Sequence, residues 1–89
     1  MFRLWARTFQ STHMLQDLVI TDDSADTRTH KIKRALDQVC LQMDLSHPVW
    51  LDSNIADFKR VSKTRFTQDS FVDAIPFDYL EIQVIEEDF

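Results

Sequence analysis

The sequence predicts an α+β fold in a single domain spanning residues 1–89, with a small, mainly antiparallel sheet covered on one face by one long and one short helix. Polar and apolar residues alternate near both ends of the chain, as they do in half-buried strands. An apolar stripe with helical spacing lies in the middle of the chain. With 44% hydrophobic and 28% charged residues, the composition is that of a globular domain.

A hairpin is predicted at the amino terminus, formed by residues 2–8 and 14–21. Apolar side chains alternate with Trp5 and two arginines in the first segment, and the second segment ends in three β-branched residues. The polar residues 10–13 have the length of a hairpin connection, although the favoured Asn-Gly turn is missing. The first 15 residues contain no acid, which also fits a transit peptide. The alternation favours a strand.

A long helix is predicted over residues 26–44. Its apolar residues recur at the spacing that places them on one helix face. They are Ile32, Ala35, Leu36, Val39, Cys40 and Met43. The preceding turn, residues 21–26, is rich in Asp and Ser, whose side chains cap free amides and suit the positive end of the helix dipole. We expect the stripe to pack on the sheet.

A shorter helix is predicted after the long one. Pro48 restricts the residue before it and cannot continue a helix, so the long helix ends before this proline. Three consecutive residues that favour N-caps then precede a short apolar pattern. The caps are Asp52, Ser53 and Asn54, and the residues expected to face inward are Ile55, Phe58 and Val61.

Two strands are predicted in the last third of the chain. Residues 64–67 are expected to form an edge strand or a surface ribbon, because the charged Lys63 and Arg65 lie close to Phe66. Residues 68–78 form a polar connection that contains Pro76. Residues 79–86 alternate between the two faces of a half-buried strand. The side chains expected on the core face are Leu80, Ile82 and Val84.

The absence of glycine excludes several classes of enzyme. Glycine allows the backbone to approach a phosphate closely or to turn sharply beneath a nucleophile. The chain contains none, so it has no phosphate-binding P-loop, dinucleotide fingerprint, nucleophile elbow or EF-hand loop. No residue pattern predicts a cofactor. The sequence therefore favours a non-catalytic protein over an enzyme.

The net charge of −5 is unevenly distributed along the chain. Residues 1–65 contain all ten Lys and Arg residues and eight acids, whereas residues 66–89 contain seven acids and no base. Two interpretations are open: the acidic segment pairs with basic residues of the same fold, or it presents an acidic face to a basic partner. The acidic total disfavours nucleic acid as a partner.

A basic stretch at residues 59–65 nevertheless supports an alternative function, a nucleic-acid-binding accessory protein. Its positive charges are suited to a phosphate backbone, and a neighbouring aromatic ring is suited to base stacking. The candidate contacts are Lys59, Arg60, Lys63, Arg65 and Phe66.

Metal and nucleophile sites have only weak signals. Asp26 and His30 are spaced to share a helix face, and Asp22 and Asp23 supply further oxygens, but helix capping explains these residues better. Cys40, the single cysteine, rules out an internal disulfide and fits a reducing compartment. Its place on the apolar stripe predicts a buried, inert thiol.

An interaction surface is predicted on the uncovered face of the sheet. A sheet with helices on one side leaves its second face open to water or to a partner. Tyr79 and Ile85 fall on that face of the last strand, and Trp5 falls on the same face of the first. We expect this face to mediate a protein contact, most simply a homodimer. Trp5, Trp50 and Tyr79 are also candidates for lining a ligand pocket, but large aromatic residues of so small a domain more often complete the core.

Three stretches carry a resemblance to a known group of proteins: residues 26–32, 45–51 and 77–84. They resemble a family of small bacterial proteins of Gram-positive type that has no assigned function. The resemblance covers most of the chain and implies a cytoplasmic protein without known functional residues. No apolar run reaches the roughly 18 residues of a membrane span. Together these observations favour a protein-interaction or regulatory module that binds another protein or itself.

Overall fold

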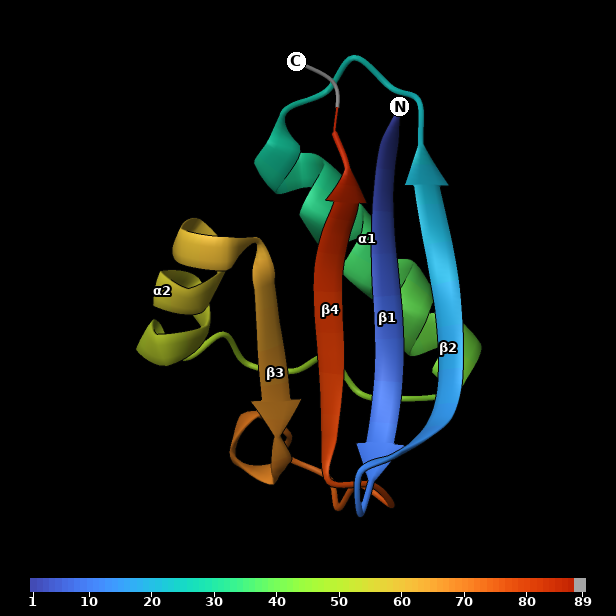
Figure 1. Cartoon of the computed structure of the whole chain (residues 1–89), viewed down its shortest axis with the longest axis vertical. Coiled ribbons are helices and arrows are strands. Elements are labelled where there is room, and N and C mark those ends of the chain that lie inside the picture. The colour runs from blue at the N-terminus through green and yellow to red at the C-terminus, as the bar shows by residue number, and fades with distance from the viewer. Residues whose placement is uncertain (88–89) are drawn as a thin grey trace.

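The computed structural model describes residues 1–87 and confirms the predicted α+β architecture. These residues form a four-stranded sheet and two α-helices (Figure 1). In chain order the elements are β1 (Phe2–Gln10), β2 (His13–Asp22), α1 (Arg28–Met43), α2 (Asp52–Val61), β3 (Lys63–Thr67), the short 3-10 helix η1 (Gln68–Ser70) and β4 (Tyr79–Glu86). For the strands and α1, the predicted bounds lie within two residues of these.

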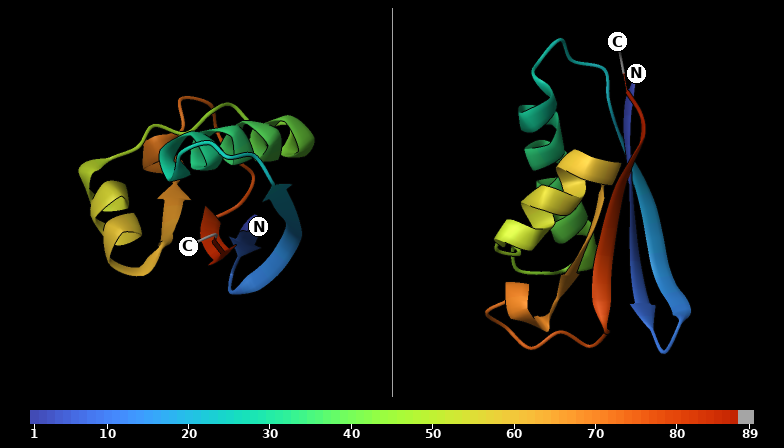
Figure 2. Two further views of the ribbon diagram at one scale, coloured as in Figure 1. Left: turned by 90° about the horizontal axis from the view of Figure 1, so that it is seen from above. Right: turned by 60° about the vertical axis from the view of Figure 1, so that its left-hand side comes forward.

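The sheet is antiparallel throughout, with the strand order β2-β1-β4-β3. The first and last strands of the chain therefore lie side by side in its centre (Figure 1). Trp5 of β1 pairs with Val19 on β2 and with Gln83 on β4, while Arg7 pairs with Glu81 on β4. Both helices lie on the same side of the sheet, as Figure 2 shows in the turned view. One sheet face is thus covered and the other is open.

The core lies between α1 and the covered face of the sheet. The predicted helical stripe is buried except for its last residue, Met43, which is half-buried. Even-numbered residues of β1, β3 and β4 complete the core, and Phe71 joins it from the connection after η1. The buried apolar strand residues are Phe2, Leu4, Ala6, Phe66, Leu80, Ile82 and Val84. The predicted core face of the last strand is therefore confirmed.

Tight turns are made here without glycine. Within residues 1–87, positive φ angles occur at Ser11 (51°), Thr12 (69°), Asp44 (56°) and Ser62 (56°). Ser11 and Thr12 form the β1–β2 turn, whose two positive φ angles give it the twist that suits a hairpin. Asp44 and Ser62 end α1 and α2 in the left-handed conformation, with backbone amides that bond back to Cys40 and Phe58. Polar side chains take the place that glycine normally occupies at such positions.

Two predictions about the helices are wrong in detail. Ile55 and Val61 of α2 were expected to face the core, but they are 42% and 50% exposed, and only Phe58 of the three is buried. The cause is that α2 packs on β3, the edge strand of the sheet. One turn of the helix is enough to cover this single strand, so the apolar residues of the other turns stay exposed. Helix α1 is capped by Thr27 rather than by the acids before it.

The start of α2 also differs from the prediction. The helix begins at Asp52, and its N-cap residue is Leu51. The amide of Leu51 donates to Oδ1 of Asn54 at 3.0 Å, so the predicted cap residue acts from inside the helix. The Asn54 amide group also donates to Thr64 Oγ1 and to the Arg65 carbonyl, both at 2.9 Å. Asn54 thereby fixes α2 against β3.

Neither helix of the described part of the chain is long and apolar enough to cross a membrane.

Candidate functional site

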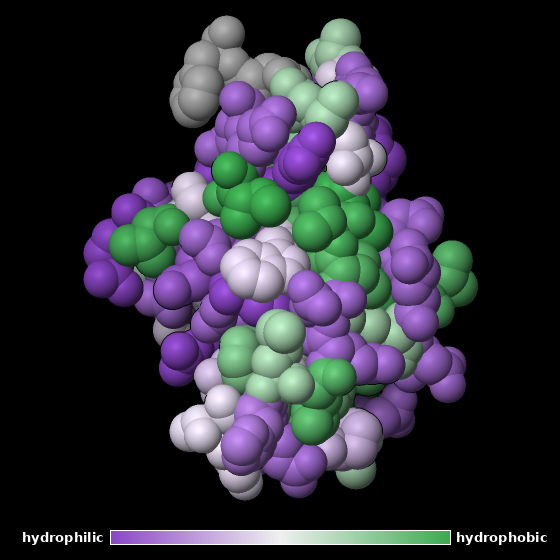
Figure 3. Space-filling model, turned by 45° about the vertical axis from the view of Figure 1, so that its right-hand side comes forward, coloured by the Kyte–Doolittle hydropathy of each residue, from purple (hydrophilic) through white to green (hydrophobic). Residues whose placement is uncertain are grey.

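The open face of the sheet combines aromatic rings with paired charges. Odd-numbered residues of β1, β3 and β4 point to this face, because successive side chains of a strand alternate. Near the end of β4 the register shifts by one residue, so that Glu86 pairs with Arg3 of the same face. Trp5, Phe9 and Tyr79 are half-buried here, and Ile85 is 45% exposed. Figure 3 shows hydrophobic groups gathered over the strands, with hydrophilic groups between them. The strands thus bring the predicted residues Trp5, Tyr79 and Ile85 onto one face.

A buried carboxylate lies at the centre of this face. Glu81 on β4 has a side chain that is only 5% exposed, and it pairs with Arg7 on one side and Arg65 on the other. Arg65 Nε donates to Glu81 Oε2 at 2.9 Å, and this bond raises the pKa of the arginine. Arg7 also donates to Gln83 Oε1 at 2.9 Å. One carboxylate therefore joins β1, β4 and β3 across the face.

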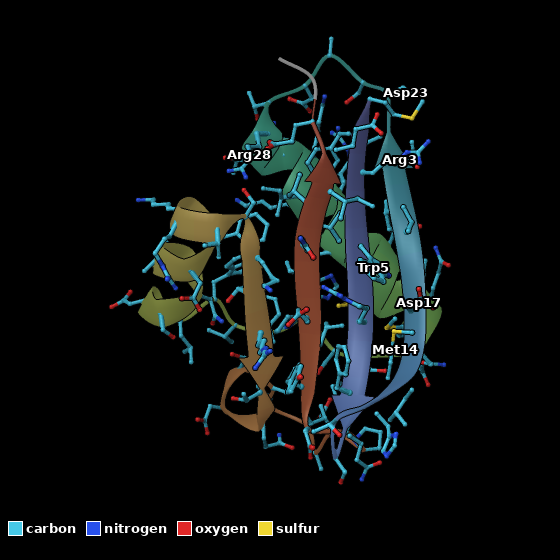
Figure 4. All side chains as sticks on the ribbon, viewed as in Figure 1. Arg3, Trp5, Met14, Asp17, Asp23 and Arg28 are labelled. Atoms are coloured by element: carbon cyan, nitrogen blue, oxygen red, sulfur yellow. The ribbon has the colours of Figure 1, made fainter. Side chains whose placement is uncertain are left out.

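The aromatic rings are stacked against these arginines. The Arg7 guanidinium lies 3.8 Å from the centre of the Trp5 ring, and the Arg65 guanidinium lies 4.6 Å from the Tyr79 ring. Tyr79 also stacks on Phe9, with 5.2 Å between ring centres. Trp5 Nε1 donates to Asp17 on β2 at 2.9 Å, a contact visible between the two labelled side chains in Figure 4. These contacts fix the rings in place and give the face a defined shape.

Three glutamates of the acidic segment pair with basic residues of the same fold, which supports one of the two interpretations left open by the sequence. Glu81 pairs with Arg7 and Arg65, Glu86 with Arg3 and the amino terminus, and Glu87 with Arg28. The antiparallel pairing of β1 with β4 explains this, because it places the last strand beside the first.

The predicted nucleic-acid contacts do not form one platform. Phe66 is 0% exposed in the core, so the expectation that its ring is available for stacking is corrected. Its position follows from strand alternation, which points Phe66 inward and Arg65 outward. Arg60 pairs with Asp57 on α2, while Arg65 pairs with Glu81 on the open face. Lys59 lies at a groove between the helices, away from both.

The acids before α1 form ion pairs with residues of that helix. Arg34 binds Asp22 at 2.9 Å and Asp26 at 2.7 Å, and His30 Nδ1 lies 2.9 Å from Asp26. Hydrogen bonds from Ser24 and then from Arg34 lower the pKa of Asp22 to about 2. Those from Arg34 and His30 lower the pKa of Asp26 further. Within residues 1–87, no three side chains of the ligating types are grouped as a metal site.

Cys40 lies in the core, as its position on the apolar stripe of the long helix predicts. Cys40 is 1% exposed on the covered side of the sheet, and burial, with a smaller effect of Asp37, raises its pKa to about 11. A nucleophilic cysteine needs a lowered pKa and access to solvent. Cys40 is therefore a small apolar core residue.

A second candidate binding surface, a groove between the two helices, is not predicted from the sequence. A groove of about 440 Å³ lies between α1 and α2, with Ile32, Trp50, Ile55 and Phe58 among its lining residues. Trp50 packs edge-on against Phe58 and against Phe66, with ring centres 5.6 and 5.0 Å apart. The sequence contains one signal of this groove. Each of the two helices has a lysine, Lys33 or Lys59, directly after an apolar residue.

Protein-family models, curated proteins and solved structures yield no match to this chain, so the resemblance to small bacterial proteins stays a prediction.

Proposed function

We propose that this chain is a non-catalytic protein-interaction module that self-associates through the open face of its sheet. The observation that carries the proposal is the row of apolar side chains left uncovered on that face by residues 1–87. Met14, Val19 and Ile85 are 49%, 47% and 45% exposed, and Val19 pairs across the strands with the half-buried Trp5. Exposed apolar and aromatic groups gathered on one face are typical of an interaction site.

The charge of the open face supports a second copy as the partner. The whole chain carries −5, so two copies repel each other on average. On the open face, however, acidic and basic side chains nearly balance. The basic residues are Arg3, Arg7, Lys63 and Arg65, and the acidic ones are Asp17, Glu81 and Glu86. Two such faces can approach each other without the repulsion that the rest of the surface produces.

The dimensions of the molecule set an upper limit on the area of this face. The chain measures 35 × 25 × 22 Å along its principal axes, and the sheet lies across the largest of the resulting faces (Figure 1). A standard interface needs roughly 800 Å² from each partner. A two-fold axis through the sheet would let the same residues of both copies meet, as in most homodimers.

The test is the mass of the protein in solution, measured by light scattering as the concentration is raised. We expect a dimer for the wild type and a folded monomer for Ile85→Lys, because the substitution places an unpaired charge inside the contact. Val72→Lys is the matched control, since Val72 is 90% exposed and lies in the connection between η1 and β4. It should leave the dimer intact.

A wild type that stays monomeric up to hundreds of micromolar, a concentration at which even weak dimers form, contradicts the proposal. A dimer that survives Ile85→Lys places the interface elsewhere. Circular dichroism establishes that each variant is folded, so a loss of dimer is not confused with unfolding.

We further propose that the module acts in the cytoplasm. A lone, buried Cys40 that needs no disulfide supports a reducing compartment. Retention of the protein in the soluble cytoplasmic fraction of its native cells is the expected result, and recovery from the culture medium would contradict it.

A further inference from the structure

The groove between α1 and α2 has an apolar floor and a basic rim. Ile32 and Phe58 form the buried part of the floor, and Ile55 lies beside them with 42% of its surface exposed. Trp50 closes the groove from the segment between the helices. This surface lies on the helical side of the molecule, so it is separate from the open sheet face.

Three cations surround this floor. Arg28 and Lys33 lie along α1, and Lys59 lies on α2. Arg28, labelled in Figure 4 at the start of α1, is held over the Phe58 ring at 5.5 Å and pairs with Glu87. Within residues 1–87, no carboxylate forms an ion pair with Lys33 or Lys59. Lys33 and Lys59, which lie beside the partly exposed apolar floor, are therefore available to pair with acidic groups of a ligand.

We propose that this groove binds an acidic amphipathic helix of another protein. The apolar side of such a helix would lie on Ile32, Ile55 and Trp50, and its flanking carboxylates would pair with Lys33 and Lys59. A volume of about 440 Å³ accommodates a few apolar side chains of a docked helix. The positive rim contrasts with the net charge of −5 of the whole chain, so it selects an acidic partner locally.

The groove favours a helix over an extended peptide. A strand binds by adding to a free sheet edge, where backbone groups are available for pairing. Here the walls are side chains of two helices and one connecting residue, Trp50. They offer no strand edge, whereas a helix satisfies its own backbone hydrogen bonds and needs only side-chain contacts.

The two tryptophans make the experiment specific, because Trp50 lies in the groove and Trp5 on the open face. In a Trp5→Phe protein, Trp50 is the single fluorescent reporter of the groove. The probes are synthetic helices of about 16 residues with Leu, Ile or Phe at positions i, i+3, i+4 and i+7 and Glu on both flanks. Titration should give a saturable shift of the Trp50 emission, and the same peptides with Lys in place of Glu should give none.

Matched variants test both parts of the groove. Lys33→Glu with Lys59→Glu should weaken binding about tenfold or more, since two favourable pairs become repulsive. Arg60→Glu on the same helix lies outside the groove and should change binding little. Ile55→Ser should abolish the shift, whereas Val61→Ser, which removes a similarly exposed residue of α2 outside the groove, should preserve it.

Three outcomes overturn the proposal: none of the acidic helices binds, the Lys-substituted peptides bind equally well, or the lysine variants bind as the wild type does. A Trp50 shift produced instead by vesicles of phosphatidylcholine and anionic phosphatidylglycerol, with no response to the peptides, would assign the groove to a membrane surface. The assay is repeated in the Ile85→Lys background, where the open face is altered. Failure of the groove and failure of the dimer are thus separate results.

Discussion

The two faces of strand β1 bury their side chains by different means. On the covered face, Phe2, Leu4 and Ala6 are almost fully buried and belong to the apolar core that α1 covers. On the open face, Arg7 is nearly as inaccessible, with 14% of its side chain exposed, but it is surrounded by Glu81, Gln83 and the Trp5 ring. One strand of nine residues therefore contributes both to an apolar core and to a paired charge cluster.

The two faces of the sheet are stabilised by different physical effects. The covered face gains its stability from removing apolar area from water, which is non-directional and tolerates changes of shape. The open face depends on specific partners, because a buried charge is tolerated only when it is paired. Arg7 Nε is buried without a hydrogen-bond partner among residues 1–87. The Arg7 charge is therefore compensated mainly by its ion pair with Glu81. We expect the two faces to respond differently to substitution.

The largest expected effect is on the open face. Glu81→Ala removes the carboxylate shared by Arg7 and Arg65 and leaves the Arg7 charge buried without a counterion. The free energy of unfolding should fall by about 3–5 kcal/mol, measured by urea denaturation. Arg65→Met is the comparison, because the Arg65 side chain is 58% exposed and its pair with Glu81 should be worth no more than about 1 kcal/mol. Equal losses for the two variants would show that the cluster behaves as a surface pair.

The covered face should lose stability through a cavity instead. Leu36 of α1 is 4% exposed in the core, and Leu36→Ala should cost on the order of 2–5 kcal/mol. Leu41 on the same helix is 75% exposed, so Leu41→Ala should change the unfolding free energy by less than about 0.5 kcal/mol. A loss below about 1 kcal/mol for Leu36→Ala would contradict the packing of this helix.

The smallest expected effect concerns Cys40, a titratable group of the covered face. Burial raises its pKa from the ordinary 9.0 to about 11, so the folded state holds the thiol proton more tightly than the unfolded chain does. This contribution is fully present below pH 9 and is lost as the pH rises through 11. It should amount to at most about 3 kcal/mol, measured as the alkaline loss of stability of the wild type relative to Cys40→Ala. A native thiol that reacts as fast as the denatured one would refute its burial.

The strands and the long helix could be predicted because their patterns are local. Alternation in residues 79–86 and the stripe from Ile32 to Met43 each depend on one face being buried, which the spacing alone reveals. The second helix was harder to predict, since Ile55 and Val61 match the helical spacing but remain exposed on a helix that packs against a single edge strand. Spacing indicates which residues share a face and leaves open how much of that face is covered.

The candidate surfaces were predictable only in part. Trp5, Tyr79 and Ile85 follow from alternation on two strands, and alternation also sets Phe66 inward once the strand is placed. The Arg7–Glu81–Arg65 cluster requires the register of three strands, which depends on long-range pairing that no local pattern specifies. The groove between the helices depends likewise on how α1 and α2 lie on the sheet.

The central claim, that the open face is the self-association surface, is tested most directly by following both indole N–H signals in ¹H–¹⁵N spectra during dilution. From about 1 mM to about 20 µM, a range that spans weak dimer dissociation, we expect the Trp5 signal and the amides of β1 and β4 to shift. The Trp50 signal, on the helical side, should stay fixed as an internal control. Spectra that do not change over this range, or changes confined to Trp50 and α2, would contradict the claim.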